Sequence, residues 1–474
     1  MTQHKRKSIA LWRRSTPSLY HHLSSFKPSF ISSVDNMRKL HKTIIFRSEV
    51  IPDKERGFLS TSLLYSQGSD IYEIDCNLPL GSFYKESESL LSGGFENKET
   101  SDSIHKDNKD INAFEDASTK KLNSKWIYSG ETIAKMAYLD DSEDSTVIVM
   151  SKNGSLAWFR DGIKVPIHIV QEMMGPSTSF SAIHSHKRPN DLAVSDFGLS
   201  ESLETLVKSQ ANGTEENSIL KIVDNSGKPG EILRVIHVPG TTVTHTVRFF
   251  DNNIFGLCSD DNTVRFWDVR TANEPIFSLS EPKNGKLTAF DASQVTNELF
   301  ITGTSTGVIK LWDIRAVEFA SKDLSYRQNG EDPIQNELVS LCHSGGDSVI
   351  DVQFSKISSA EFLTVGNTGN VYHWDMEYFF SRNDDDNEQQ YSTSKRVRRT
   401  TTNSIPALEE LQGQCLKFFH SGVSNNNGSS SSKFGRKNTV AWHPIIDDLV
   451  CTVNDSSLVS VYKPFTLKSS NPHD

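Results

Sequence analysis

With 474 residues and a formal net charge of −10, the chain is long enough to bury a sizeable core without disulfide or metal staples. The negative charge excludes a uniformly basic surface and disfavours direct DNA binding. The five cysteines are scattered without a CxxC pair, which argues against a structural zinc site and fits a reducing compartment. No apolar run approaches the ~20 residues of a membrane helix, so we expect no membrane span and an intracellular protein.

The first predicted element is a helix over residues 15–30, preceded by a basic tail at 1–14. Thr16 is a suitable N-cap, and Pro17 suits the first helical position because its missing N–H needs no partner there. An apolar stripe recurs at spacings of four, three and four residues: Leu19, Leu23, Phe26 and Phe30. This spacing is typical of one helix face, which we expect to dock on the rest of the chain.

The opposite face of this helix carries Tyr20 and His21, which we predict to be available to a protein partner. His21 and His22 are adjacent, and another histidine cluster, HSH, stands at 184–186. A metal site would need further ligands, and we find none at suitable spacing. We therefore predict that these histidines are solvated or capping, with no metal and no cofactor.

Repeated units decide the fold. The segments CSDDNTVRFWDVR (258–270) and GTSTGVIKLWDIR (303–315) are copies of one unit, and VGNTGNVYHWDME (365–377) is a third. Each copy ends on a Trp-Asp pair: Trp267 and Asp268, Trp312 and Asp313, Trp374 and Asp375. Such endings, after a turn and an alternating strand, are the signature of WD40 propeller blades.

More divergent copies of a strand, a polar turn and a second strand lie at 60–75, 145–160, 205–224 and 448–464. The sequence therefore predicts an all-β fold, a seven-bladed WD40 β-propeller over residues 42–465, preceded by the N-terminal α-helix. Residues 42–50 have β-propensity but no blade of their own. We predict that they form the outer strand of the last blade, because an unpaired terminal edge would be a liability.

Other segments lack strand periodicity. Residues 81–124 are rich in Ser, Glu, Lys, Asp and Asn, and residues 421–433 are rich in Ser and Asn. Residues 378–412 combine an acidic block with a basic one. The composition predicts disordered insertions at these three places, and a C-terminal tail at 466–474.

In WD blades the closing Trp, a Ser or Thr on the preceding strand, a turn Asp and a His before the blade form a buried hydrogen-bonded set. The copy at 258–270 offers Trp267, Ser259 and Asp261, but the expected His is missing. Thr306 and Thr368 replace the turn Asp in the next two copies. We therefore expect these structural residues to rely more on apolar packing than on such networks.

Two motifs suggest other classes of protein. GTSTG (303–307) matches the G-x-S-x-G of hydrolases, with Ser305 at the nucleophile position. That motif requires a following helix, whereas VIKLWD predicts a strand, so Ser305 is expected to be a turn residue and the protein not to be an enzyme. Arg270 and Arg315, two residues after each Asp, also resemble the motif that cullin-4 adaptors recognise in ubiquitin-ligase substrate receptors.

The segment WRRSTPSLY (12–20) resembles the N-terminal helix of the histone-binding WD-repeat family. In that family an acidic loop after the sixth Trp-Asp pair lies beside this helix, and the two hold a helix of histone H4. NDDDNE (383–388) stands at the corresponding place. The resemblance implies a protein-binding surface made by these residues: Tyr20, His21, Asp384, Asp385, Asp386 and Glu388.

A second resemblance covers nearly the whole chain. The words YSQGSDIYEID, IKVPIHIVQEMMGP, HVPGTTVTHTVRFF, YRQNGEDPIQNE and SLVSVYKPF are similar to the Wtm/Ume transcriptional modulators of budding yeasts. This resemblance implies a nuclear scaffold that represses meiotic genes and supports silencing. The partner it implies is the ribonucleotide reductase small subunit, with related family members as further candidates, whereas the histone-binding resemblance implies deacetylase or chromatin proteins. The basic run KRVRR (395–399) and the basic N-terminus also fit nuclear import, with a cytoplasmic pool left open.

Overall fold

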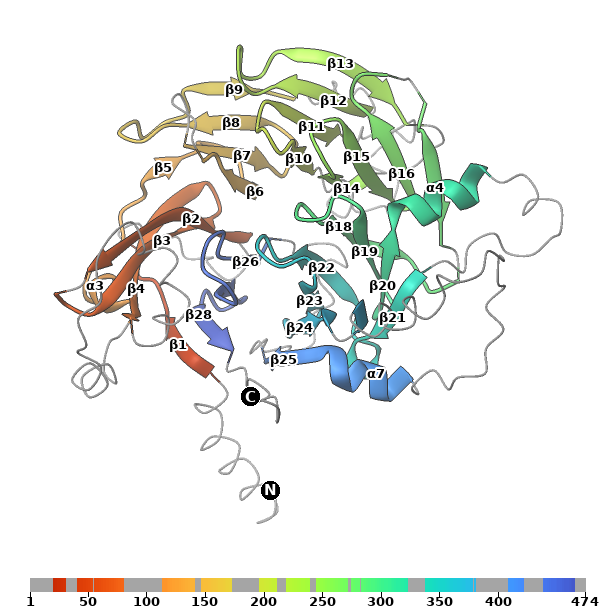
Figure 1. Cartoon of the computed structure of the whole chain (residues 1–474). Coiled ribbons are helices and arrows are strands. Elements are labelled where there is room, and N and C mark those ends of the chain that lie inside the picture. Colours follow the sequence, from red (N-terminus) through yellow and green to blue (C-terminus); the bar gives the residue numbers. More distant parts are fainter. Residues whose placement is uncertain are drawn as a thin grey trace, which may run out of the picture. The chain divides into compact units, whose positions relative to one another are not determined.

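Alternating and fully apolar strand patterns produce antiparallel four-stranded sheets along the chain (Figure 1). The computed structural model describes residues 20–30, 41–53, 55–80, 113–140, 146–172, 196–210, 219–238, 244–271, 274–281, 283–322, 337–377, 379–380, 408–421 and 438–464. Within these ranges the strands form seven sheets of four strands each, which we number blades 1 to 7. This is the predicted seven-bladed WD40 β-propeller, so the fold class is confirmed.

Blades 1 to 3 follow chain order. Blade 1 contains β2 (Lys42–Asp53), β3 (Phe58–Gln67), β4 (Asp70–Pro79) and β5 (Trp126–Ile127). Blade 2 contains β6 (Ile133–Tyr138), β7 (Val147–Ser151), β8 (Leu156–Phe159) and β9 (His168–Val170). Blade 3 contains β10 (Phe197–Leu199), β11 (Thr205–Gln210), β12 (Ile219–Asp224) and β13 (Ile232–His237).

Blades 4 to 6 contain the three Trp-Asp copies. Blade 4 contains β14 (Thr244–Phe249), β15 (Ile254–Ser259), β16 (Thr263–Asp268) and β17 (Phe277–Ser280). Blade 5 contains β18 (Leu287–Ala292), β19 (Leu299–Thr304), β20 (Val308–Asp313) and β21 (Glu337–Cys342). Blade 6 contains β22 (Val349–Phe354), β23 (Glu361–Gly366), β24 (Val371–Asp375) and β25 (Leu416–His420).

Blade 7 unites the two ends of the chain. It contains β26 (Val440–Trp442), β27 (Val450–Val453) and β28 (Val459–Pro464), and its fourth strand is β1 (Tyr20–Phe26), which pairs antiparallel with β28. The chain falls into two compact units, residues 1–147, 160–165 and 438–474 in one, and 148–159 and 166–437 in the other. Blades 1 and 7 lie in the first unit, and blades 3 to 6 lie in the second.

The predicted helix over 15–30 is wrong in its described part. Residues 20–26 form β1, in which Phe26 is buried while Leu23 is 41% exposed. Leu23 and Phe26, two members of the predicted stripe, therefore lie on a strand and differ in burial, as period two requires, and do not share a helix face. The free edge of β28 offers backbone partners to this segment, and such tertiary pairing overrides local helix signals. Residues 15–19 and the tail at 1–14 lie outside the described residues.

The prediction for residues 42–50 is also wrong. These residues belong to β2, which pairs with β3 from Lys42 opposite Gln67 to Asp53 opposite Phe58. They therefore open blade 1 instead of completing blade 7. The edge that they were expected to cover is occupied by β1.

Two predicted insertions contain ordered structure. Within 81–124, Ala113 and Phe114 are fully buried and α3 (Glu115–Thr119) follows them. The Phe114 ring stacks on Phe26 at 4.7 Å between centroids, which explains why this polar segment is anchored. At the end of 378–412, the helix α7 (Leu408–Cys415) leads into β25. Residues 81–112, 381–407, 422–437 and 465–474 lie outside the described residues.

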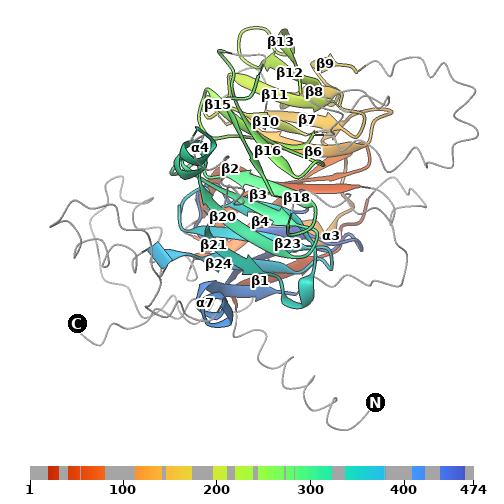
Figure 2. The same ribbon diagram turned by 90° about the vertical axis from the view of Figure 1, so that its right-hand side faces the viewer.

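Apolar side chains fill the space between successive sheets of the second unit. Rings from blades 4 and 5 form one such layer, with Phe250, Phe266, Phe290 and Phe300 in mutual contact. The helix α4 (Ile314–Lys322) packs on β17 and β20, and α7 packs on β21 and β25. Figure 2 shows the strand order of blade 3, with β13 at one margin. Within the described ranges, no helix is long and apolar enough to cross a membrane.

Candidate protein-binding surface

The predicted partner surface is described only at its strand end. Tyr20, at the start of β1, meets the Tyr462 ring edge-on with centroids 5.7 Å apart, and burial raises its pKa to about 12. His22 is buried, and this burial lowers its pKa to about 4, so the expectation that it is solvated is wrong. The side chain of His21 lies outside the description, as do Asp384, Asp385, Asp386 and Glu388. The composite surface therefore stays a prediction.

The three Trp-Asp pairs lie at the ends of the third strands of blades 4, 5 and 6. Trp267, Trp312 and Trp374 are buried on the third strands of blades 4, 5 and 6. Each following Asp accepts the backbone N–H two residues later, at 2.8 Å for Asp268, Asp313 and Asp375. These carboxylates therefore hold the turns that follow the strands.

Arg270 and Arg315 turn back on the same carboxylates. Arg270 donates from Nη2 to Asp268 Oδ2 at 2.6 Å, and hydrogen bonding to its guanidinium lowers the pKa of Asp268. Arg315 pairs with Asp313 at 3.2 Å and with Glu298 at 2.7 Å. This geometry favours an intramolecular role for both arginines over recognition by a ubiquitin-ligase adaptor.

Ser305 occupies the turn between β19 and β20, as predicted. Its Oγ accepts the Lys286 N–H at 3.0 Å, and β20 follows directly. A hydrolase nucleophile of the G-x-S-x-G type must stand on a strand-to-helix turn. The local structure therefore lacks the context that this motif needs.

Blade 6 contains a buried network that the sequence reading missed. His343 Nε2 lies 2.6 Å from Thr364 Oγ1, and Trp374 Nε1 donates to the same oxygen at 2.9 Å. Nδ1 lies 3.0 Å from the Asp347 carbonyl, so it carries the proton, and Nε2 accepts from the Thr364 hydroxyl. Burial lowers the pKa of His343 to about 4. The sequence signal that could have predicted this network is a His directly after the fourth strand of the preceding blade.

The equivalent positions of blade 3 carry charges instead. Lys208 takes the place of Thr364. Thr364 stands two residues after Phe362, which lies opposite Trp374, and Lys208 stands two residues after Leu206, which lies opposite Val223. Glu172 lies before this blade, as His343 lies before blade 6, and it pairs with Lys208 and with Lys221 Nζ at 2.7 Å. Burial lowers the pKa of the fully enclosed Lys208, and the Glu172 carboxylate opposes that effect.

Blade 5 has both a Trp-Thr hydrogen bond, as in blade 6, and a Lys-Glu ion pair, as in blade 3. Trp312 Nε1 donates to Thr302 Oγ1 at 2.9 Å, while Lys310 on the same strand pairs with Glu281 at 2.9 Å. Blade 4 has neither. Leu257 takes the threonine position there, and Trp267 Nε1 is buried without a hydrogen-bond partner among the described residues.

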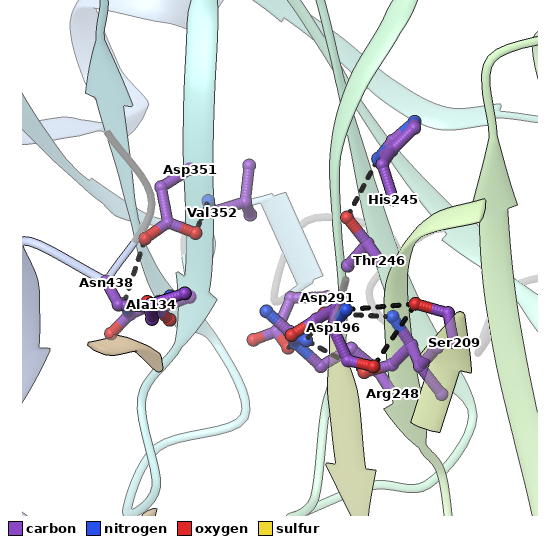
Figure 3. Close-up of polar contacts among 12 residues, drawn as sticks. Ala134, Asp196, Ser209, His245, Thr246, Arg248, Asp291, Asp351, Val352 and Asn438 are labelled. Carbon is purple, nitrogen blue, oxygen red and sulfur yellow. Dashed lines mark hydrogen bonds and ion pairs between the residues drawn. The ribbon is translucent and has the colours of Figure 1, made fainter. Parts of the chain in front are cut away.

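A second polar cluster joins four blades of the second unit (Figure 3). Arg248 on β14 donates to Asp196, before β10, at 2.6 Å and to Asp291 on β18 at 3.0 Å. Asp291 also accepts the Phe354 N–H of β22 at 2.8 Å. Burial raises the pKa of Asp291, against the opposing effect of Arg248. The polar atoms in these contacts bond strands of different blades to one another, so the cluster has a structural role and is not a reaction centre.

The comparisons place these features in a family. The chain is 60% identical to transcriptional modulator WTM2 of Saccharomyces cerevisiae, over 96% of this chain and 94% of the relative. It is 55% identical to transcriptional modulator WTM1 of the same yeast, with coverages of 97% and 99%. Transcriptional regulatory protein UME1, also of that yeast, is 38% identical over 98% of this chain and 95% of its own length. No family model matches the chain.

Proposed function

Because the chain belongs to the Wtm/Ume family of transcriptional modulators, we propose that it is a non-enzymatic nuclear scaffold that regulates transcription by binding other proteins. The observation that carries the proposal is the end-to-end similarity to three relatives named for transcriptional regulation. The WD40 fold supports it, because such propellers present loops and sheet edges to partners. The polar clusters described above support it too, because their atoms are occupied in holding the blades together.

The finer role that we propose is repression of meiotic genes and support of silencing. A further role is nuclear retention of the ribonucleotide reductase small subunit. The similarity to several named relatives at once supports the role in transcription more directly than the role in retention. The two roles differ in their partners, which makes them separable by one measurement.

The experiment is affinity purification of the tagged full-length protein from nuclear extract, with mass spectrometry of bound proteins. Recovery of deacetylase subunits supports repression and silencing, and recovery of the reductase small subunit supports retention. Imaging of a fluorescent fusion in the same cells checks the nuclear location. A strictly cytoplasmic fusion that recovers neither class would contradict the proposal.

The acidic run at 383–388 favours a second candidate, a histone H4-binding subunit of a deacetylase or chromatin-assembly complex. Acidic side chains near an apolar surface suit a basic amphipathic helix. A labelled H4 helix peptide is expected to bind at low salt and to lose affinity when Asp384, Asp385 and Asp386 are changed to Asn. No binding by the wild-type protein at low salt would remove this candidate.

A further inference from the structure

The fourth strand of blade 3, β13, exposes three large apolar side chains. Ile232 is 44% exposed, Leu233 58% and Val235 43%. The fourth strand of blade 5, β21, shows the opposite pattern, because each of its six positions is buried or only partly exposed. Both strands close a sheet of the same fold. The difference therefore lies in what covers them.

Helices cover the corresponding strands of the later blades. The helix α4 packs against β17 of blade 4. The helix α7 packs against β21 and β25 of blades 5 and 6 (Figure 1). Neither helix makes such a contact with β13. An apolar edge strand with open backbone groups is a template for pairing with another strand, and proteins normally cover or charge such edges. Among the described residues, the β13 edge lacks the helix that lies against the fourth strands of blades 4, 5 and 6.

The charge at this edge is positive. The Arg234 guanidinium donates to the carbonyl oxygens of Val269 at 3.2 Å and Thr271 at 2.7 Å, and among the described residues it has no carboxylate partner. Lys221 lies opposite Val235 in the sheet and shares the single Glu172 carboxylate with Lys208. Two lysines on one carboxylate leave an excess positive charge beside the strand, in a chain whose net charge is −10.

The same charge disfavours pairing between two copies of β13. In an antiparallel pair, the register that places Leu233 opposite the Val235 of the second copy also places the two Arg234 residues opposite each other. Like charges directly opposite each other destabilise a strand pair. The register that would bury the apolar residues best is therefore the one that the arginine opposes, and the edge fits a partner of complementary charge.

We propose that β13 is a docking edge for an extended segment of a protein partner. The segment adds a fifth strand to blade 3, with main-chain hydrogen bonds supplying affinity. Its residue opposite Arg234 is Asp or Glu, and its neighbours on each side are apolar residues that face Leu233 and Val235. The inference deepens the proposed scaffold function. It rests on that function for one point only, namely that the ligand is a protein.

Binding of two matched peptides to the full-length protein tests the inference. Both are labelled, end-capped nine-residue peptides that alternate Val and Thr, one with Glu at the centre and the other with Lys. Fluorescence anisotropy at low salt should show the Glu peptide binding roughly fivefold more tightly, since cross-strand charge pairs contribute up to ~1 kcal/mol. Equal affinities, or no binding by either peptide, would overturn the inference.

Charge reversal at the arginine gives the sharper readout. Arg234→Glu should invert the preference, so that the Lys peptide becomes the tighter ligand. Leu233→Glu, at an exposed position, should weaken the Glu peptide more than the Lys peptide and serves if Arg234→Glu does not fold. Ile357→Ser, which changes an equally exposed apolar residue in blade 6, should leave both affinities unchanged.

The remaining outcomes are also decisive. A preference for Glu that survives in both charge variants would overturn the inference, as would a dimer of the wild-type protein in sedimentation that Leu233→Glu abolishes. The assay has no transcriptional readout. If peptide binding fails while nuclear location and partner recovery succeed, only the docking edge is wrong, and the proposed function stands.

Discussion

Blades 3 and 6 occupy equivalent positions with different chemistry. In blade 6 a neutral His343 bonds Thr364, which accepts from Trp374. In blade 3 the same places hold Glu172 and Lys208, and Val223 replaces the tryptophan. The difference teaches that a bridge between a loop and the second strand can be built as a neutral network or as a buried ion pair at the same place in the fold. The two kinds of bridge should fail differently.

The largest effect is expected from Glu172→Ala. The substitution leaves the fully buried Lys208 without its carboxylate, and breaking a buried pair by removing one partner costs about 3–5 kcal/mol. Urea unfolding followed by tryptophan fluorescence measures the loss. Glu231→Ala, which removes a half-exposed partner of Lys228, should change stability by no more than about 0.5 kcal/mol. Adding Lys208→Met to Glu172→Ala should restore much of the loss, and a double variant as unstable as the single one would contradict this account.

The next effect is the response of blade 6 to acid. The pKa of His343 falls from 6.5 to about 4 on burial, so the unfolded chain binds this proton first as pH decreases. Stability should therefore be full above about pH 6.5 and fall as pH drops from about 6.5 towards 4, by about 3 kcal/mol at most. Unfolding free energies of wild type and His343→Gln at several pH values check the prediction. His373 and His420, whose pKa values are also lowered, titrate in both proteins, so the difference between the curves isolates His343.

A smaller effect separates blades 5 and 6. Thr364→Val removes a hydroxyl that serves both His343 and Trp374, and should cost about 2–3 kcal/mol because two buried groups lose their partner. Thr302→Val removes an acceptor from Trp312 alone and should cost about 1 kcal/mol. Thermal midpoints of the two variants provide the comparison. Equal losses would show that the His343 contact contributes nothing.

The smallest effect concerns blade 4, which has no bridge at this place. Leu257→Val removes one methylene from the core, and Leu257→Thr has nearly the same shape as Val with a hydroxyl in place of one methyl. In most cores the Thr variant is the less stable of such a pair, because its hydroxyl is buried unpaired. Here the hydroxyl can accept from Trp267 Nε1, so Leu257→Thr should be at least as stable as Leu257→Val. If Leu257→Thr is less stable than Leu257→Val by about 1 kcal/mol or more, Trp267 gains nothing from the new hydroxyl.

The repeat pattern was sufficient for the fold and for the Trp-Asp turns, because a turn followed by an alternating strand is a local signal. The turn between β7 and β8 contains Asn153 and Gly154, a strong local turn signal, and Gly154 has a φ of 85° there. The bridges were harder to predict. Glu172 and Lys208 are 36 residues apart, and only a charged residue within a predicted strand hinted at a buried partner. The Arg248 cluster joins residues from four blades, so no window of sequence contains it.

The sequence by itself determined the blades, their tryptophans and the absence of a hydrolase context at Ser305, since each depends on neighbours along the chain. Tertiary structure alone decided that residues 20–26 form a strand. Leu23 and Phe26 are spaced as on a helix face, but β28 offers an open edge 435 residues away, where Ser25 meets Ser460 at 2.7 Å. Tertiary structure also decided that, among the described residues, no helix packs against β13 as α4 packs against β17 and α7 against β21. Edges and their covers arise from packing between distant segments, and local propensity contains no record of them.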